Sequence, residues 1–122
     1  MSDTRNILIV EDDEEMCGVL NNIFASEGYN IWVATTGKEA LNKIKENNID
    51  LIIMDYKLPD MTGKKILELL RSKNKKMNTI IISAYGTKQI KQELCDLGAI
   101  AFFDKPFELN KLMKISQTIL EQ

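Results

Sequence analysis

The stretch LIIMDYKLPDMTG, residues 51–63, carries the strongest signal for the fold. Its first four residues are apolar and lead into a single carboxylate, Asp55. Three residues that favour turns follow: Pro59, Asp60 and Gly63. A short apolar run closed by turn residues predicts a buried β-strand that leaves the core at Asp55. A polar residue at the end of a strand is also an ordinary way to start a loop, so the meaning of Asp55 depends on the rest of the chain.

Short apolar runs and helical patterns alternate along the chain. The runs predict five strands, at residues 6–10, 29–34, 51–54, 79–83 and 100–103. Apolar residues between them recur at helical spacing, and the last helix is expected from about Leu109. Gly28 and Gly98 each follow a helical pattern, where glycine commonly ends a helix, and TGKE at residues 36–39 has the form of a capping box. The alternation predicts an α/β fold of the (βα)5 type, a doubly wound five-stranded parallel sheet covered on both faces.

The chain of 122 residues suits one domain, expected at residues 1–122 with no output domain after the fifth helix. Hydrophobic residues make up 44% of it, enough for a packed core. No apolar run reaches the roughly 18 residues that span a bilayer, and the start MSDTRN does not resemble a secretory signal. Cys17 and Cys95 are expected to be reduced, partly buried thiols of a cytoplasmic protein.

The charge balance and the missing residue types exclude several classes of function. The formal net charge of −2 gives no electrostatic footprint for nucleic acid. The chain has no histidine, which excludes zinc sites with His ligands, Ser–His–Asp triads and a phosphohistidine on this chain. Its chemistry must therefore use carboxylates, hydroxyls, lysine or a metal ion.

Ligands of open parallel α/β sheets bind at the carboxyl ends of the strands. The residues at these ends are Glu11, Asp12 and Asp13 for the first strand, Asp55 for the third, Ser83 and Ala84 for the fourth, and Asp104, Lys105 and Pro106 for the fifth. Because parallel strands end at one edge of a sheet, we expect these side chains to lie close together.

The acids among these residues predict a metal site. Converging carboxylates repel one another by about 1–4 kcal/mol per close pair in partly solvated surroundings. Mg²⁺ relieves such repulsion, since it prefers oxygen ligands and bridges carboxylates to phosphoryl groups. Glu11 and Asp12 directly follow a buried strand and are the expected ligands. Glu14 and Glu15 fit an acidic, solvated helix start.

Ser83 and Lys105 complete an apparatus for phosphoryl transfer. The Ser83 hydroxyl could donate to a phosphoryl oxygen, and the Lys105 ammonium group could neutralise its charge. Taken singly, each fits an ordinary turn hydroxyl or a solvated lysine. Together with a metal ion they predict phosphoryl transfer to a nucleophilic Asp55, with positioning and charge neutralisation doing most of the catalysis.

Four motifs at the strand ends resemble the receiver domains of response regulators in two-component signalling. They are ILIVEDD, DLIIMDYKLPDMTG, IIISAYG and FFDKPF, and the resemblance covers essentially the whole chain. It implies the flavodoxin-like receiver fold, with Asp55 as phospho-acceptor. It also implies a Mg²⁺ ion held by Asp12, by Glu11 through water, by Asp55 and by the backbone carbonyl of Lys57. Asp13 lies in the same turn, so a shift of these roles by one residue stays open.

The resemblance also implies roles for the remaining residues at the strand ends. Ser83 matches the switch hydroxyl, Lys105 matches the lysine that contacts the phosphoryl group, and the bond before Pro106 is expected to be cis. Phe102 matches an aromatic switch residue that is often tyrosine, but its ring has no hydroxyl to donate. An ordinary core aromatic is an equal alternative for Phe102.

Lys57 and Tyr85 resemble the residues that tune the lifetime of the aspartyl phosphate in this family. A bulky Tyr85 could hinder the attacking water. These expectations describe a signalling receiver that assists its own phosphorylation and dephosphorylation, rather than an enzyme in the usual sense.

The implied partners are a sensor histidine kinase or a histidine phosphotransfer protein, and a downstream protein that binds the face of the fourth helix, fifth strand and fifth helix. No nucleic acid or membrane partner is expected, and the expected location is the cytoplasm.

The main alternative is a protein-interaction module that works without phosphorylation. A haloacid-dehalogenase-type phosphatase would need an acid at Lys57, and a flavodoxin-like FMN carrier would need a phosphate loop without the acids of EDDEE.

Overall fold

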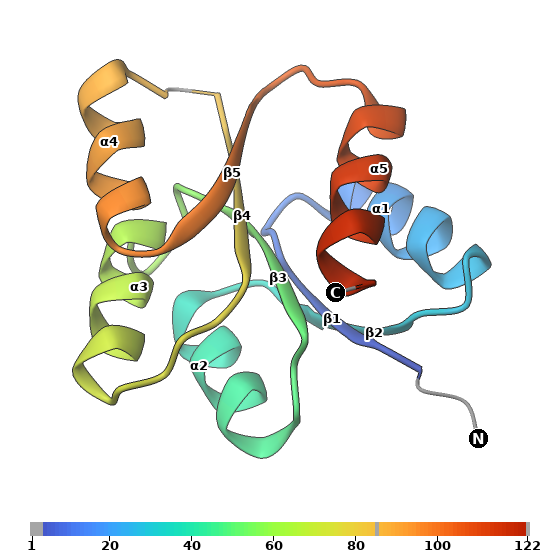
Figure 1. Cartoon of the computed structure of the whole chain (residues 1–122), viewed down its shortest axis with the longest axis horizontal. Helices are drawn as coiled ribbons and strands as arrows, with labels where there is room; N and C mark the ends of the chain where they lie inside the picture. Colours follow the sequence, from blue (N-terminus) through green and yellow to red (C-terminus); the bar gives the residue numbers. More distant parts are fainter. Residues whose placement is uncertain (1–3, 85, 122) are drawn as a thin grey trace.

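The computed structural model describes residues 4–84 and 86–121 and has one parallel sheet of strand order β2-β1-β3-β4-β5 (Figure 1). The strands are β1 (Asn6–Val10), β2 (Asn30–Ala34), β3 (Leu51–Asp55), β4 (Thr79–Ser83) and β5 (Ala99–Asp104). The helices are α1 (Glu14–Ser26), α2 (Gly37–Glu46), α3 (Gly63–Ser72), α4 (Lys88–Asp96) and α5 (Leu109–Leu120). The predicted (βα)5 fold with a five-stranded parallel sheet is confirmed.

The strand boundaries differ slightly from those predicted. The two predicted strands at residues 6–10 and 79–83 match β1 and β4, whereas β2 begins one residue later. β3 and β5 both continue into a carboxylate, because Asp55 stays in register with Ile82 and Asp104 with Ser83. Asp55 and Asp104, which the sequence suggested as loop residues, are therefore the last paired residues of β3 and β5.

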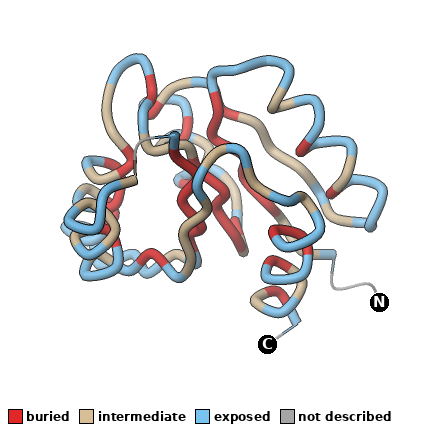
Figure 2. Tube along the Cα trace, turned by 90° about the horizontal axis from the view of Figure 1, so that it is seen from above, coloured by how far each residue is buried: buried red, intermediate tan, exposed pale blue. Residues whose placement is uncertain are grey.

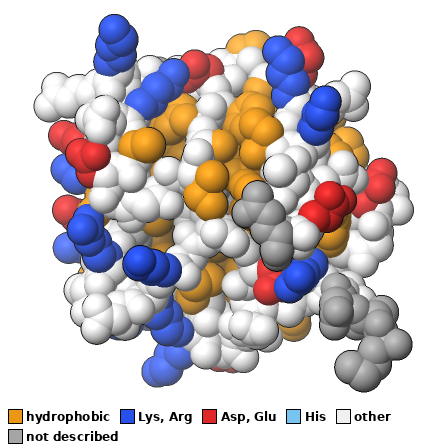
Figure 3. Space-filling model, viewed as in Figure 1, with side chains coloured by type: hydrophobic (Ala, Val, Ile, Leu, Met, Phe, Trp, Pro, Cys, Tyr) orange, Lys and Arg blue, Asp and Glu red, His pale blue; other side chains and the backbone are white. Residues whose placement is uncertain are grey.

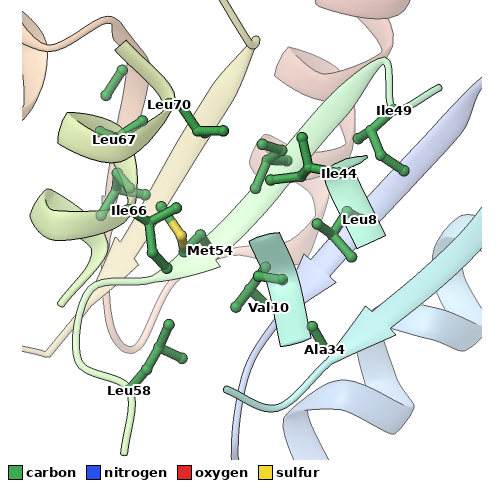
Figure 4. Packing of buried hydrophobic residues seen from close by; sticks show 14 of the residues in the cluster. Leu8, Val10, Ala34, Ile44, Ile49, Met54, Leu58, Ile66, Leu67 and Leu70 are labelled. Atoms are coloured by element: carbon green, nitrogen blue, oxygen red, sulfur yellow. The ribbon is translucent and has the colours of Figure 1, made fainter. Parts of the chain in front are cut away.

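Each face of the sheet packs against its own helices. α2, α3 and α4 cover one face, while α1 and α5 cover the other (Figure 1). The strand residues on the first face are Leu8, Val10, Ala34, Ile52, Met54 and Ile81, several of them seen in Figure 4. Those on the second face are Ile7, Ile9, Leu51, Ile53, Ile80 and Ile82. Because β1, β3 and β4 are buried on both faces, apolar residues follow one another along the middle of these strands and do not alternate with polar ones. Figure 2 shows the buried segments gathered in the middle of the molecule.

Local signals in the sequence end and start several helices as expected. Gly28 and Gly98 follow α1 and α4 with φ angles of +91° and +106°, a conformation that favours glycine. At the start of α2, the Thr36 hydroxyl accepts a hydrogen bond from the Glu39 amide at 3.1 Å. The Glu39 carboxylate returns to the amide of Thr35, at 3.3 Å, rather than to that of Thr36. The capping box is therefore present in a form shifted by one residue.

The two cysteines differ in exposure. Cys17 is half-buried and its thiol donates to the carbonyl of Glu11 at 3.0 Å. Cys95 is exposed, so the expectation that both thiols are partly buried is wrong for Cys95. The residue before it, Leu94, is the one that α4 buries against the sheet, which turns Cys95 outward.

The surface mixes charges of both signs. Figure 3 shows acidic and basic side chains interspersed over the face that it presents, with small apolar areas between them. Among residues 4–84 and 86–121, none of the helices combines the length and the apolar character that crossing a bilayer requires.

The packing predicts very different costs for two isoleucine truncations. Ile53 lies in the central strand and is 1% exposed, so Ile53→Ala should lower the free energy of unfolding by about 3 kcal/mol. Ile100 is 50% exposed on the edge strand β5, so Ile100→Ala should cost less than about 1 kcal/mol. Urea unfolding followed by circular dichroism measures both values. Equal losses would contradict the placement of Ile53 in the core.

Candidate functional site

The candidate site lies where β1, β3, β4 and β5 end. These strands are neighbours in the sheet, so residues far apart in the sequence meet at one edge. A cavity of about 300 Å³ opens there, lined by Asp12, Asp55, Lys57, Leu58, Pro59, Ala84 and Lys105. The strand-end rule applied to the sequence therefore located this cavity.

Three carboxylates converge at the cavity. Oxygen atoms of Glu11, Asp12 and Asp55 all lie within 4.8 Å of one another. Glu11 is only 2% exposed, Asp55 is half-buried and Asp12 is exposed. Asp13 takes a different place, because its side chain accepts a hydrogen bond from the amide of Glu15 at 3.1 Å and caps α1.

The ammonium group of Lys105 bridges two of the carboxylates. Its Nζ atom lies 2.8 Å from Glu11 Oε1 and 2.8 Å from Asp55 Oδ2. The main-chain amide of Lys105 donates to the carbonyl of Ser83 at 2.9 Å, which fixes the end of β5 against β4. The peptide bond between Lys105 and Pro106 is cis, as the resemblance implied.

Burial and pairing shift the acid–base properties of this group. Burial raises the pKa of Glu11 above its ordinary value, although the bond from Lys105 opposes the shift. Burial also disfavours the charge of Lys105, but its bonds to Asp55 and Glu11 outweigh that cost and raise the pKa of Lys105. The pair thus favours a charged lysine, while Glu11, the more deeply buried partner, carries the larger desolvation cost. Burial, and then the nearby charges of Glu11, Asp13, Asp12 and Glu14, raise the pKa of the Cys17 thiol to about 11, so it stays protonated at neutral pH.

The donor set fits a hard divalent cation. Three carboxylates and one ammonium group leave a formal charge of −2 at one end of the cavity. Mg²⁺ carries the opposite charge and prefers carboxylate oxygens with several retained waters. The exposed side of the cluster, at Asp12, leaves room for such waters.

The loop after β3 touches the Asp55 carboxylate directly. The amide of Lys57 donates to Asp55 Oδ1 at 3.1 Å, and Lys57 also lines the cavity. Both oxygens of Asp55 therefore have a hydrogen-bond donor, one from the main chain and one from Lys105.

The two residues expected to act as switches lie on neighbouring strands. Ser83 is the last residue of β4 and is buried. Phe102 is half-buried on β5 and packs against the same apolar cluster as α4. Lys91 of α4 lies 5.1 Å from the centre of the Phe102 ring and pairs with Asp104 at 2.9 Å. Tyr85, the expected lifetime-tuning residue, lies outside the described residues.

Sequence reasoning missed one contact near the site. The sequence pattern predicts only a turn at Asp60. Its carboxylate accepts hydrogen bonds from the amides of Gly37 at 2.7 Å and Lys38 at 2.9 Å, at the start of α2. These partners are 23 and 22 positions away, so no local pattern in the sequence could reveal them.

Comparison with known proteins identifies the family. A model of the response regulator receiver domain matches residues 7–117. The chain is 36% identical over 108 residues to sporulation initiation phosphotransferase F of Bacillus subtilis (strain 168), covering 88% of this chain and 87% of that protein. It is 31% identical to regulatory protein AtoC of Escherichia coli (strain K12), of which it spans only 26%.

Solved structures agree in fold. A response regulator receiver domain protein (CheY-like) from Methanospirillum hungatei JF-1 superposes with a TM-score of 0.89 at 32% identity, covering 98% of this chain and 96% of that one. The response regulator protein TrrA from Thermotoga maritima, in complex with Mg²⁺-BeF, gives a TM-score of 0.83 at 29% identity, covering 96% and 100%.

The matches span all the strand ends that build the cavity. The matched family is the response regulator receiver domain, and the relative from Bacillus subtilis is named a phosphotransferase. This chain therefore belongs to the response regulator family as a receiver domain.

Proposed function

We propose that Asp55 accepts a phosphoryl group from a phosphohistidine of a sensor histidine kinase or a histidine phosphotransfer protein. The observation that carries this proposal is the Asp55 carboxylate itself, half-buried at a strand end, bonded to Lys105 and surrounded by two further acids. The modified chain then changes its binding to a downstream protein or passes the phosphoryl group on.

The chain's own groups prepare Asp55 for attack. The Lys57 amide and the Lys105 ammonium group hold the carboxylate in one orientation. An Asp55 oxygen forms a bond to phosphorus while the phosphorus–nitrogen bond of the donor breaks, and the ring nitrogen keeps the electron pair. Lys105 neutralises charge on the transferred group, and the Ser83 hydroxyl donates to one of its oxygens.

Glu11, Asp12, Asp55 and the backbone carbonyl of Lys57 would hold Mg²⁺, with Glu11 acting through water. The bound ion would neutralise charge on the carboxylates and on the phosphoryl oxygens. The complex of TrrA with Mg²⁺-BeF supports the proposal that the chain binds Mg²⁺. In the same proposal the chain assists both its phosphorylation and its dephosphorylation, and Lys57 and Tyr85 tune the lifetime of the phosphoryl group.

The new charge, about −1.5 to −2 near neutral pH, would draw Ser83 toward the phosphoryl group and let Phe102 change position. Phe102 lies under Lys91 of α4, so its movement would alter the face made by α4, β5 and α5. A downstream protein in the cytoplasm would bind this face. Couplings of this kind are typically about 1–3 kcal/mol.

Phosphorylation of Asp55 is tested by intact mass. With Mg²⁺ and acetyl phosphate, the parent chain should gain about 80 Da, because one HPO₃ unit becomes attached to a carboxylate. Asp55→Asn should gain nothing, while Asp96→Asn, which removes an exposed acid on α4, should behave like the parent. A gain in Asp55→Asn would identify another acceptor. No gain in the parent, with a phosphohistidine donor also failing, would favour a phosphorylation-independent interaction module.

Replacing the Asp12 carboxylate should stabilise the metal-free chain and weaken the stabilisation that Mg²⁺ provides. In EDTA, Asp12→Asn should raise the free energy of unfolding by about 1 kcal/mol, because it removes one repelling charge from the cluster. At a Mg²⁺ concentration of about 100 times the Kd of the parent, Mg²⁺ should raise the free energy of unfolding of the parent by about 2.7 kcal/mol. The same concentration should raise that of Asp12→Asn by far less. Thermal unfolding with and without Mg²⁺ measures both effects. An equal Mg²⁺ effect in the two proteins would remove Asp12 from the metal site.

Loss of the lysine should have a pH-dependent cost. Lys105→Met removes the cation that opposes the raised pKa of Glu11, so that pKa should rise further. A raised carboxyl pKa means that stability is present at low pH and is lost as pH rises past the ordinary value of 4.5. In EDTA the loss of unfolding free energy should therefore be smallest below pH 4.5 and grow as the pH rises above it, reaching about 3 kcal/mol.

The matched control is Lys91→Met, which breaks an exposed ion pair with Asp104. It should cost less than about 1 kcal/mol across the same pH range. Urea unfolding at several pH values compares the two variants. A loss for Lys105→Met that does not change with pH would contradict the role given to Glu11.

A further inference from the structure

The loop between β3 and α3, residues 56–62, is fastened to the start of α2. Asp60 in this loop bonds through Oδ1 to the Gly37 amide and through Oδ2 to the Lys38 amide. These bonds hold the pKa of Asp60 below its ordinary value, so the carboxylate is ionised at neutral pH. A negative charge at this end of the helix is also favoured by the helix dipole.

Two apolar contacts strengthen the same junction. The Met61 side chain packs on Gly37, which is buried, and a Cβ atom at Gly37 would collide with Cγ of Met61 and lie 2.6 Å from its Sδ. Leu58 is buried at 7% exposure and belongs to the same apolar cluster as Met54 (Figure 4). The loop is therefore held by the helix on one side and by the core on the other.

Main-chain hydrogen bonds within the loop also join its first residues to its last ones. The amide of Leu58 donates to the carbonyl of Met61 at 3.2 Å, and an antiparallel bridge joins Lys57 to Thr62. Lys57 in turn donates its amide to Asp55 Oδ1. Hydrogen bonds thus fasten the loop at two points, to the first turn of α2 through Asp60 and to the Asp55 carboxylate through the amide of Lys57.

We propose that Asp60 is a positioning residue for Asp55, which fixes the β3–α3 loop against α2 and so holds the main chain of Lys57 at the edge of the phosphorylation site. The inference rests on the proposed function, because the site that Asp60 positions is the proposed site of metal binding and phosphorylation. It gives α2 a part in that site, although none of the cavity-lining residues belongs to α2 within the described chain.

A purely structural role for Asp60, as a cap of α2, makes a different prediction. The first turn of α2 receives three side-chain bonds: Asp60 takes the amides of Gly37 and Lys38, and Thr36 takes the amide of Glu39. Both residues therefore stabilise the start of the helix, but only Asp60 also belongs to the loop. Thr36→Ala is the matched control, because it weakens the same helix end and leaves the loop attached.

The experiment compares Mg²⁺ affinity, by isothermal titration calorimetry, in the parent, Asp60→Ala, Asp60→Asn and Thr36→Ala. Both alanine variants should lose a similar amount of thermal stability. The Kd for Mg²⁺ should rise about tenfold in Asp60→Ala, the size seen when a group that orients a metal ligand is lost, and should change less than about twofold in Thr36→Ala. Asp60→Asn keeps one acceptor oxygen and should lie between the parent and Asp60→Ala.

Hydrogen exchange supplies a readout that needs no metal. Peptides that cover residues 56–62 should exchange faster in Asp60→Ala than in the parent, and at the parental rate in Thr36→Ala.

Gly37→Ala perturbs the same junction through Met61 while the Asp60 side chain is unchanged. This variant should also raise the Kd for Mg²⁺.

The outcomes separate the two hypotheses. If the parent binds Mg²⁺ and Asp60→Ala binds it equally well, the positioning role is overturned and Asp60 is only a helix cap. If Thr36→Ala and Asp60→Ala weaken Mg²⁺ binding equally, the positioning role is also overturned, because the loss of affinity would then follow the stability of α2. If the parent itself binds no Mg²⁺, the proposed function fails, and the inference fails with it.

Discussion

The ammonium group of Lys105 is the contact on which the site depends. It joins Glu11 and Asp55, which lie 94 and 50 positions away in the sequence, and so connects the ends of β1, β3 and β5. A parallel sheet brings all its carboxyl ends to one edge, and here that edge gathers carboxylates that repel one another. Lys105 reduces the repulsion between these carboxylates by pairing with two of them, and the cluster still keeps a net negative charge. The same negative charge is what would attract a divalent cation.

The apolar sheet provides the rigid support that such a cluster needs. Both faces of β1, β3 and β4 are buried, so the strands cannot slide or rotate to relieve repulsion at their ends. Glu11 shows the cost, since it is a buried acid whose pKa is raised by its surroundings. A site of this kind reduces stability locally, and the continuous core on the two sides of the sheet offsets the loss.

The sequence predicted the sheet and the cavity well because both follow from simple rules. Apolar runs gave the strands, and residues at strand ends gave Glu11, Asp12, Asp55 and Lys105, which the structure brings together. Contacts between separate elements were beyond those rules. The bond from Asp60 to α2, the outward turn of Cys95 and the packing of Lys91 on Phe102 depend on how each helix is rotated and placed. Periodicity indicates which side of a helix faces the sheet, but not which loop meets its end.

The order of strands in the sheet has a consequence for folding. β1 and β3 are neighbours although α1, β2 and α2 separate them in the chain, and the lysine that completes the site comes only after the last strand. Pairings between such distant segments are slow to form because long loops must close first. Lys105 can therefore bridge Glu11 and Asp55 only once the last strand is in place. Competence for phosphorylation would arise together with the complete sheet, so a partner protein would meet either a finished site or none.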